Sequence, residues 1–187
     1  MTTRALISKL AAAASRLAGN TRGVSAVETA LLLPVMLMVY LGTAEVAMAI
    51  STYRQVDLAA NTVTNLVSQY TTISASSQMP DILDASAQVL YPNTPANVKV
   101  VVSLITVNSK GTKATITWSQ TLNGTARTVG ATYSLPSSLM VANTSVVLGE
   151  VTYPYTAAVD FLKLGTVNLS SSIYMIPRAA TTINLTS

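Results

Sequence analysis

The sequence predicts an α+β fold in which a long N-terminal transmembrane helix continues into an amphipathic helix that packs on an antiparallel β-sheet. Two observations support this class. A long apolar stretch near the N-terminus is followed, without a break, by apolar residues at helical spacing. The later part of the chain alternates apolar and polar residues with a period of two, which is typical of strands. A helical first part and a strand-rich second part together indicate α+β architecture.

Residues 1–23 form a basic leader that contains all of the chain's excess charge. They include no acid and four basic residues, namely Arg4, Lys9, Arg16 and Arg22. The remainder carries seven basic and seven acidic residues and is therefore neutral. By the positive-inside rule, we expect the N-terminus in the cytoplasm and the chain after about residue 51 outside. Nucleic-acid binding requires a basic face on the folded part, so the neutral remainder predicts no nucleic-acid partner.

The apolar stretch from Thr29 to Ile50 is long enough to span a membrane. A helix of 22 residues covers about 33 Å, and the hydrocarbon core of a bilayer is about 30 Å thick. Its one charge, Glu45, lies near the far end, where a solvated interfacial carboxylate is the expected reading. Nine Leu, Val or Ile residues favour insertion and outweigh that charge. Small residues at 43–50 leave open an alternative, a secretory signal peptide cut near residue 50.

The helical pattern continues beyond the span as an apolar stripe. Its members recur at spacings of three and four: Val56, Ala59 or Ala60, Val63, Leu66 or Val67, and Tyr70. We expect one helix from about residue 24 to about residue 70, with this stripe packed in the core of the outer domain. A second, short helix is expected over 80–91, where Pro80 suits the first turn.

Strands are expected in the rest of the chain, because β-branched residues and period-two alternation dominate it. The expected strands are 97–108, 113–121, 146–155 and 166–176, with a hairpin turn at 108–112. Trp118 is expected to pack on a sheet face. The segment 122–145 is expected to be rich in loops, 156–165 to hold a short helix, and the tail 179–187 to be loose.

Composition argues against an enzyme. The chain has no Cys and no His, which removes thiolate nucleophiles, disulfides and the commonest general base and metal ligand. Asp81 and Asp84 could suggest a catalytic pair, but they suit the positive end of the second helix better. No metal-ligand cluster or phosphate-binding loop is present, so we expect no cofactor.

Glu28 is the acid that needs an explanation, because it lies where the apolar helix begins. An acid at the edge of a membrane is a candidate functional residue, and its partner should be identifiable. Before it, Arg22 is the only candidate partner, and no basic residue lies one helical turn away. A cut after Gly23 would give Val24 a free ammonium group about one turn from Glu28 on the same helix face.

This arrangement resembles the type IV pilins and pseudopilins, in which a basic leader, a cleaved Gly and a Glu at mature position five precede an apolar helix. Gly23, Val24 and Glu28 match that pattern. More narrowly, 23-GVSAVETALLLPVMLMVYLG-42 is similar to the TadE/TadF-like pseudopilins of tight-adherence (Tad) pili, although Thr29 stands where an aromatic residue is usual. Shorter pieces also look like the periplasmic region of TadE-like proteins: 62–74, 79–92, 117–120, 150–155 and 173–178.

The resemblance implies a domain organisation and a set of partners. Residues 1–23 would be a cytoplasmic leader removed by a prepilin peptidase at Gly23 and Val24, residues 24–53 the transmembrane helix, and residues 54–187 a periplasmic α+β domain with a pilin-like fold. The chain would be a single-pass protein of the bacterial inner membrane. Its partners would be the peptidase, other pilins and pseudopilins of the same system, and inner-membrane lipid.

The implied function is that of a pseudopilin, or minor pilin, required for assembly of Tad (Flp-type) pili, with Glu28 serving recognition or assembly. Whether the mature chain enters the pilus itself, and whether its role is that of TadE or of TadF, stays open. An alternative is an unprocessed signal-anchored envelope protein whose outer domain binds a partner or a surface.

Overall fold

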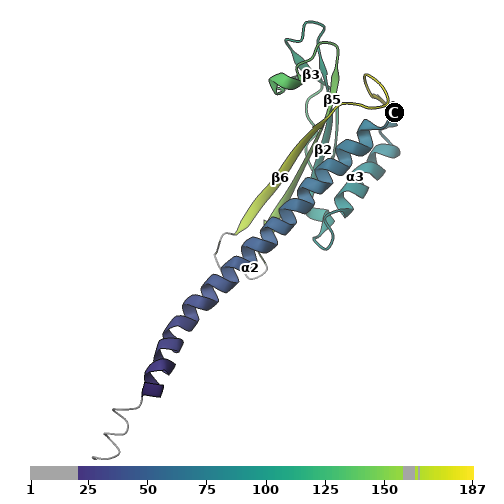
Figure 1. The fold of residues 1–187 in the computed structure, drawn as a ribbon. Helices are drawn as coiled ribbons and strands as arrows, with labels where there is room; N and C mark the ends of the chain where they lie inside the picture. The colour runs from purple at the N-terminus through teal and green to yellow at the C-terminus, as the bar shows by residue number, and fades with distance from the viewer. Residues whose placement is uncertain (1–20, 158–162, 164) are drawn as a thin grey trace, which may run out of the picture. The chain divides into compact units, whose positions relative to one another are not determined.

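The computed structural model describes residues 21–157, 163 and 165–187, and it confirms the α+β class (Figure 1). The described helices are α2 (Thr21–Ser68) and α3 (Gln78–Gln88), with 3-10 turns at Pro95–Asn97 and Ser137–Leu139. The described strands are β1 (Thr72–Ser74), β2 (Lys99–Val107), β3 (Ala114–Leu122), β4 (Thr132–Tyr133), β5 (Ser145–Thr156), β6 (Thr166–Met175) and β7 (Asn184–Thr186). Most of the predicted leader, and most of the segment 156–165 with its predicted helix, lie outside these residues.

The chain divides into two compact units, Met1–Ala44 and Glu45–Ser187, with the boundary inside α2. In the first unit, the described residues form a helix whose apolar side chains are half to three-quarters exposed from Val24 to Tyr40. Pro34 lies inside this helix without ending it, which spanning helices tolerate. By length and composition, α2 can cross a membrane, with a mean hydropathy of 2.0 in its most apolar window. These properties suggest a single-pass membrane protein.

The second unit contains a five-stranded antiparallel sheet of order β4-β3-β2-β5-β6. Strands β2 and β3 form the predicted hairpin, in which the register shifts once, between Leu104 and Ile105. Strand β5 returns beside β2, and all ten residues of β6 pair with β5. Each long strand lies within two residues of its predicted bounds, because the β-branched alternation that marks it in the sequence also decides which face it buries.

The core of the second unit brings the C-terminal part of α2, α3 and the sheet together (Figure 1). Five residues of the predicted stripe are fully buried: Val56, Ala59, Ala60, Val63 and Val67. They belong to one cluster with side chains of α3 and of strands β2, β3 and β5. A hydrogen bond of 2.7 Å from Ser171 Oγ on β6 to Asp57 Oδ1 adds a polar contact beside this cluster. Helix α2 ends at Ser68, slightly before the predicted end near Tyr70.

The prediction of a loose C-terminal tail is wrong. Strand β7 pairs in parallel with β1, and Ile183 just before it is 1% exposed. The backbone carbonyl of Ile183 accepts a hydrogen bond of 2.8 Å from the indole Nε1 of Trp118. Trp118 itself is buried in the core, as predicted. Both β1 and β7 have only three residues, too few to show an alternating pattern, so their pairing could not be read from the sequence.

Candidate cleavage and assembly site

The predicted site residues lie on one exposed helical segment. Helix α2 begins at Thr21, so Gly23, Val24 and Glu28 all fall within its first turns. All three are exposed, and Val24 is 59% exposed. A Cβ built at Gly23 would meet no atom within 4 Å, so the residue is not required by close packing there. All three residues are therefore exposed at the surface of the single chain.

The helix places Val24 and Glu28 four residues apart, which is the spacing of neighbouring side chains on one helix face. In the uncut chain, residue 24 offers no charge to the carboxylate. Within the described part of the chain, Glu28 makes no ion pair or hydrogen bond. Its neighbour Thr29 is different, because the Thr29 hydroxyl donates a hydrogen bond of 2.9 Å to the backbone carbonyl of Ser25. Glu28 is therefore a free charge beside an apolar helix.

Gly23 gives this segment a weak point in the backbone. A glycine inside a helix costs about 1 kcal/mol relative to alanine, because it loses more conformational freedom on folding. Gly23 therefore lowers the helical stability of the segment that contains Val24 and Glu28.

The second unit holds one charged cluster that the sequence did not reveal. Arg127 and Glu150 form a two-point ion pair, with distances of 2.6 Å from Nη2 to Oε1 and 2.9 Å from Nε to Oε2. The Arg127 guanidinium also lies 5.0 Å from the ring centre of Tyr133, whose hydroxyl is 3.0 Å from that of Tyr174. Tyr133 lies on β4 and Tyr174 on β6, the two edge strands of the sheet, so the cluster links the loop-rich excursion and both edge strands to Glu150 of β5.

Two pKa values in this cluster are raised. The pKa of Arg127 lies above its usual value, chiefly because its side chain donates hydrogen bonds to the Glu150 carboxylate. The pKa of Tyr133 is also raised, first by partial burial of its phenol and then by the hydrogen bond with Tyr174. Both shifts keep the groups in their ordinary protonation states at neutral pH. They give no sign of a group prepared for proton transfer.

Metal-binding groups are not gathered anywhere in the described residues. No three His, Cys, Asp or Glu side chains there come close enough to hold an ion. Asp81 is in the first turn of α3, where its charge suits the positive end of the helix.

The expectation that Glu45 is a solvated interfacial carboxylate is wrong. Glu45 is 9% exposed and is buried within the second unit. The groups around it include Tyr155 and Val167, which follow Glu45 by more than 100 positions. A local reading of the apolar stretch could not have brought these residues together.

The TadE-like protein family has a sequence model that matches residues 23–64 of the chain. The match begins at Gly23 and confirms the resemblance over those residues, including Glu28; most of the downstream pieces that look TadE-like lie beyond it. It suggests a minor pilin associated with a Tad pilus, and proteins of this family are structural pilus proteins rather than enzymes. No curated protein and no solved structure matches the chain.

Proposed function

Because residues 23–64 match the TadE-like family, we propose that this chain is a pseudopilin, or minor pilin, that is required for assembly of Tad (Flp-type) pili. The precursor crosses the bacterial inner membrane once, with its leader in the cytoplasm and residues 54–187 in the periplasm. A prepilin peptidase cuts after Gly23. The observation that carries this proposal is that the family match starts at the proposed cleavage residue and includes the exposed, unpaired Glu28.

Cleavage changes the charge on both sides of the cut. It removes the four basic residues of the leader, which hold the N-terminus on the cytoplasmic side. It also creates an ammonium group on Val24, one helical turn before the Glu28 carboxylate. A helical pair at this spacing contributes only about 0.2–0.5 kcal/mol in water. The same pair at a membrane interface also lowers the cost of keeping the Glu28 charge beside lipid.

The apolar part of α2 then serves assembly. Its side chains from Val24 to Tyr40 are exposed in the single chain, so they can contact either lipid or the helices of neighbouring pilins. Helices in lipid associate through packing and polar pairing rather than through the hydrophobic effect. A Glu28 carboxylate that contacts the ammonium of its own or a neighbouring subunit would therefore set the register between packed helices.

Measuring cleavage of the precursor and formation of pili separately in each variant tests this proposal. Gly23→Ala should leave an uncut precursor, because the peptidase requires that residue. Glu28→Ala should still be cut but should give no pili, because the mature helix lacks its acid. Thr29→Ala is the matched control, since its hydroxyl bonds only to a carbonyl of its own helix, and it should be cut and should assemble.

The alternative, an unprocessed anchored protein that binds a partner, predicts a different set of results. Gly23→Ala would then have no effect, and a different transmembrane anchor would support function. Normal pili from Glu28→Ala cells would rule out the assembly role.

A further inference from the structure

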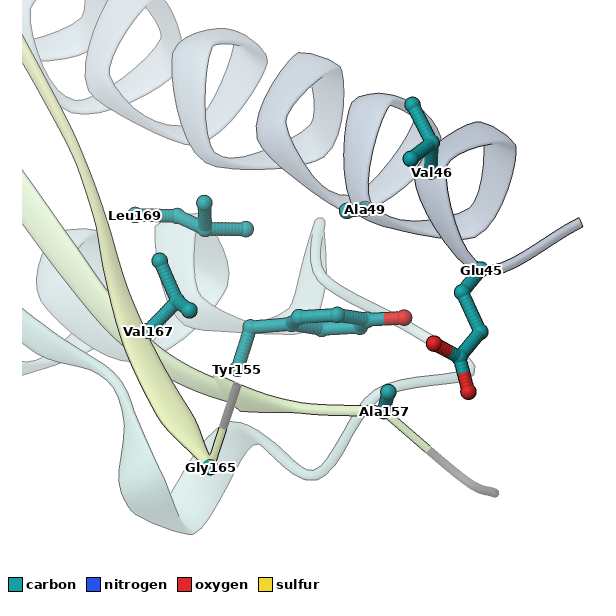
Figure 2. A pocket seen from close by; sticks show the side chains of 8 residues that line it. All are labelled: Glu45, Val46, Ala49, Tyr155, Ala157, Gly165, Val167 and Leu169. Carbon is teal, nitrogen blue, oxygen red and sulfur yellow. The ribbon is translucent and has the colours of Figure 1, made fainter. Parts of the chain in front are cut away.

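A groove of about 330 Å³ lies at one end of the second unit. Its walls come from the start of β5 and from the segment after β6, and they include Asn143, Thr144, Ser145, Ile176, Pro177 and Arg178. Strand β5 runs from this end to the opposite end of the sheet, where Tyr155 and Val167 line a cavity with Ala49 of α2 (Figure 2). Every residue of the groove belongs to the second unit, so the groove does not depend on the position of the first unit.

Three basic side chains lie in and beside this groove. Arg178 lines it, and Lys110 and Lys113 belong to the turn between β2 and β3. That turn is joined to the wall of the groove, because the backbone N–H of Asn143 donates a hydrogen bond of 3.4 Å to the carbonyl of Asn108. All three basic residues are exposed, and none of them takes part in an ion pair within the described part of the chain. Their charges are therefore available to a ligand.

The charge of this end differs from that of the rest of the unit. Residues 108–113, 143–145 and 176–181 contain three basic residues and no acid. The rest of the second unit contains four basic residues and six acids. Two of these acids, Asp81 and Asp84, lie on α3, which does not line the groove. A negatively charged ligand is thus attracted to the groove, and no acidic side chain in its walls repels that ligand.

The walls of the groove combine the groups that an acidic sugar requires. Asn143 and Thr144 supply an amide and a hydroxyl, which exchange hydrogen bonds with hydroxyl groups of the kind that sugars carry. The side chain of Ile176 is 61% exposed and offers an apolar surface to the C–H face of a sugar ring. The planar guanidinium of Arg178 can donate two parallel hydrogen bonds to one carboxylate. A sugar that bears a carboxylate fits this combination.

We propose that this end of the second unit binds an acidic polysaccharide, with one uronate carboxylate on Arg178 and carboxylates of neighbouring sugars beside Lys110 and Lys113. A single exposed ion pair contributes little, so a polymer that contacts all three cations binds better than a free monosaccharide. A single-stranded nucleic acid fits less well, because its bases stack on aromatic rings and no aromatic ring is among the described residues that line the groove. The inference goes beyond the proposed function and requires neither cleavage after Gly23 nor assembly of pili.

Binding of the full chain to immobilised polygalacturonate tests this proposal. The protein is extracted from its native membrane and placed in phosphatidylcholine nanodiscs, which carry no net charge, and neutral dextran is the reference polymer. All variants are compared in one N-terminal form, cut or uncut, because the basic residues of the leader can bind a polyanion by themselves. We expect binding to polygalacturonate but not to dextran, and we expect its affinity to fall as salt is added.

Four variants locate the binding site. Arg178→Ala should raise the Kd for polygalacturonate about tenfold, because a two-point charged hydrogen bond is lost. Arg178→Lys keeps the charge but not the planar fork, so its Kd should lie between those of the unchanged chain and Arg178→Ala. Lys110→Ala should raise the Kd by a smaller factor, about two- to threefold, because it removes one exposed ion pair. Lys99→Ala is the matched control, since it removes an exposed lysine near the opposite end of β5, where Lys99 pairs with Thr152, and it should leave the Kd unchanged.

Three outcomes would overturn the polysaccharide site. The first is an equal change of Kd in Arg178→Ala and Lys99→Ala, and the second is equal binding of the unchanged chain to dextran and to polygalacturonate. The third is tighter binding to single-stranded DNA than to polygalacturonate, with the same dependence on Arg178, which would make the ligand a nucleic acid. In each case, a chain that is still cut after Gly23 and still forms pili would leave the proposed function standing.

Discussion

Gly149 of β5 lies directly against Thr64 of α2. A Cβ built at residue 149 would overlap the Thr64 hydroxyl oxygen and would come within 3.0 Å of Val63 Cγ1 and 3.2 Å of the Ala60 carbonyl oxygen. Thr64 is itself fixed, because its hydroxyl donates a hydrogen bond of 2.6 Å to that same carbonyl. The glycine thus allows the C-terminal part of α2 to approach the sheet closely enough to bury its apolar stripe.

Gly149→Ala should destabilise the second unit by about 1–3 kcal/mol, the usual cost of an extra methyl group in a packed core. The added carbon meets a helix backbone and two short, fixed side chains, and none of these can move aside without moving α2. The midpoint of thermal unfolding, followed by circular dichroism in detergent, should fall by several degrees.

A double-mutant comparison distinguishes this contact from a general effect of alanine in a strand. Thr64→Ala removes the atom that the new Cβ meets first, so it should recover part of the stability lost in Gly149→Ala. Thr64→Val keeps a carbon in that place and should recover none. If Thr64→Ala changes stability equally in the unchanged chain and in Gly149→Ala, the close approach is not the cause.

Ile183→Ala should cost about 2–5 kcal/mol, because Ile183 is buried in the core although it precedes a strand of only three residues. The residue's carbonyl accepts the hydrogen bond of Trp118, the single tryptophan of the chain. Tryptophan emission should therefore shift to longer wavelength at lower urea concentration in this variant than in the unchanged chain. Thr182→Ala, an exposed neighbour, is the control and should unfold with the unchanged protein. An Ile183→Ala variant that unfolds with this control would mean that the tail is loose after all.

Stability should fall as pH rises above about 10, because the pKa of Tyr133 is raised in the folded chain. Below the usual tyrosine pKa of about 10, the phenol is neutral in both states. Above it, the unfolded chain loses the proton first, so unfolding is favoured progressively until the pH passes the folded value. Tyr133→Phe removes the ionisation and should weaken this alkaline dependence, as measured by urea midpoints between pH 8 and pH 11.

Thr132→Ala, at the exposed neighbour of Tyr133 on β4, provides a comparison for that experiment. It removes no ionisable group, so it should leave the slope of stability against pH unchanged. An identical alkaline slope in Tyr133→Phe and in the unchanged chain would contradict the assignment to Tyr133.

The long helix and the long strands could be predicted because the apolar residues of each recur with the repeat of a helix or of a strand. The stripe from Val56 to Val67 follows the helix repeat, and strands β2, β3, β5 and β6 follow the strand repeat. In the same way, Gly23 and Glu28 could be singled out because a charge beside an apolar run is visible in one short window. The family match begins at the first of these two residues.

The features that could not be predicted depend on contacts between residues that are distant in the sequence. Strands β1 and β7 have three residues each and become strands only by pairing across more than 100 positions. The Arg127–Glu150 pair and the burial of Glu45 arise in the same way, from chain segments that meet only in the folded unit. No local period or spacing could have signalled them.

The measurement that tests the central claim most directly is the N-terminal residue of the protein extracted from its native membrane, determined by intact mass and by Edman sequencing. The account predicts a chain that begins at Val24, with its ammonium one helical turn from Glu28. A functional chain that still begins at Met1, or one that begins near residue 50, would contradict it.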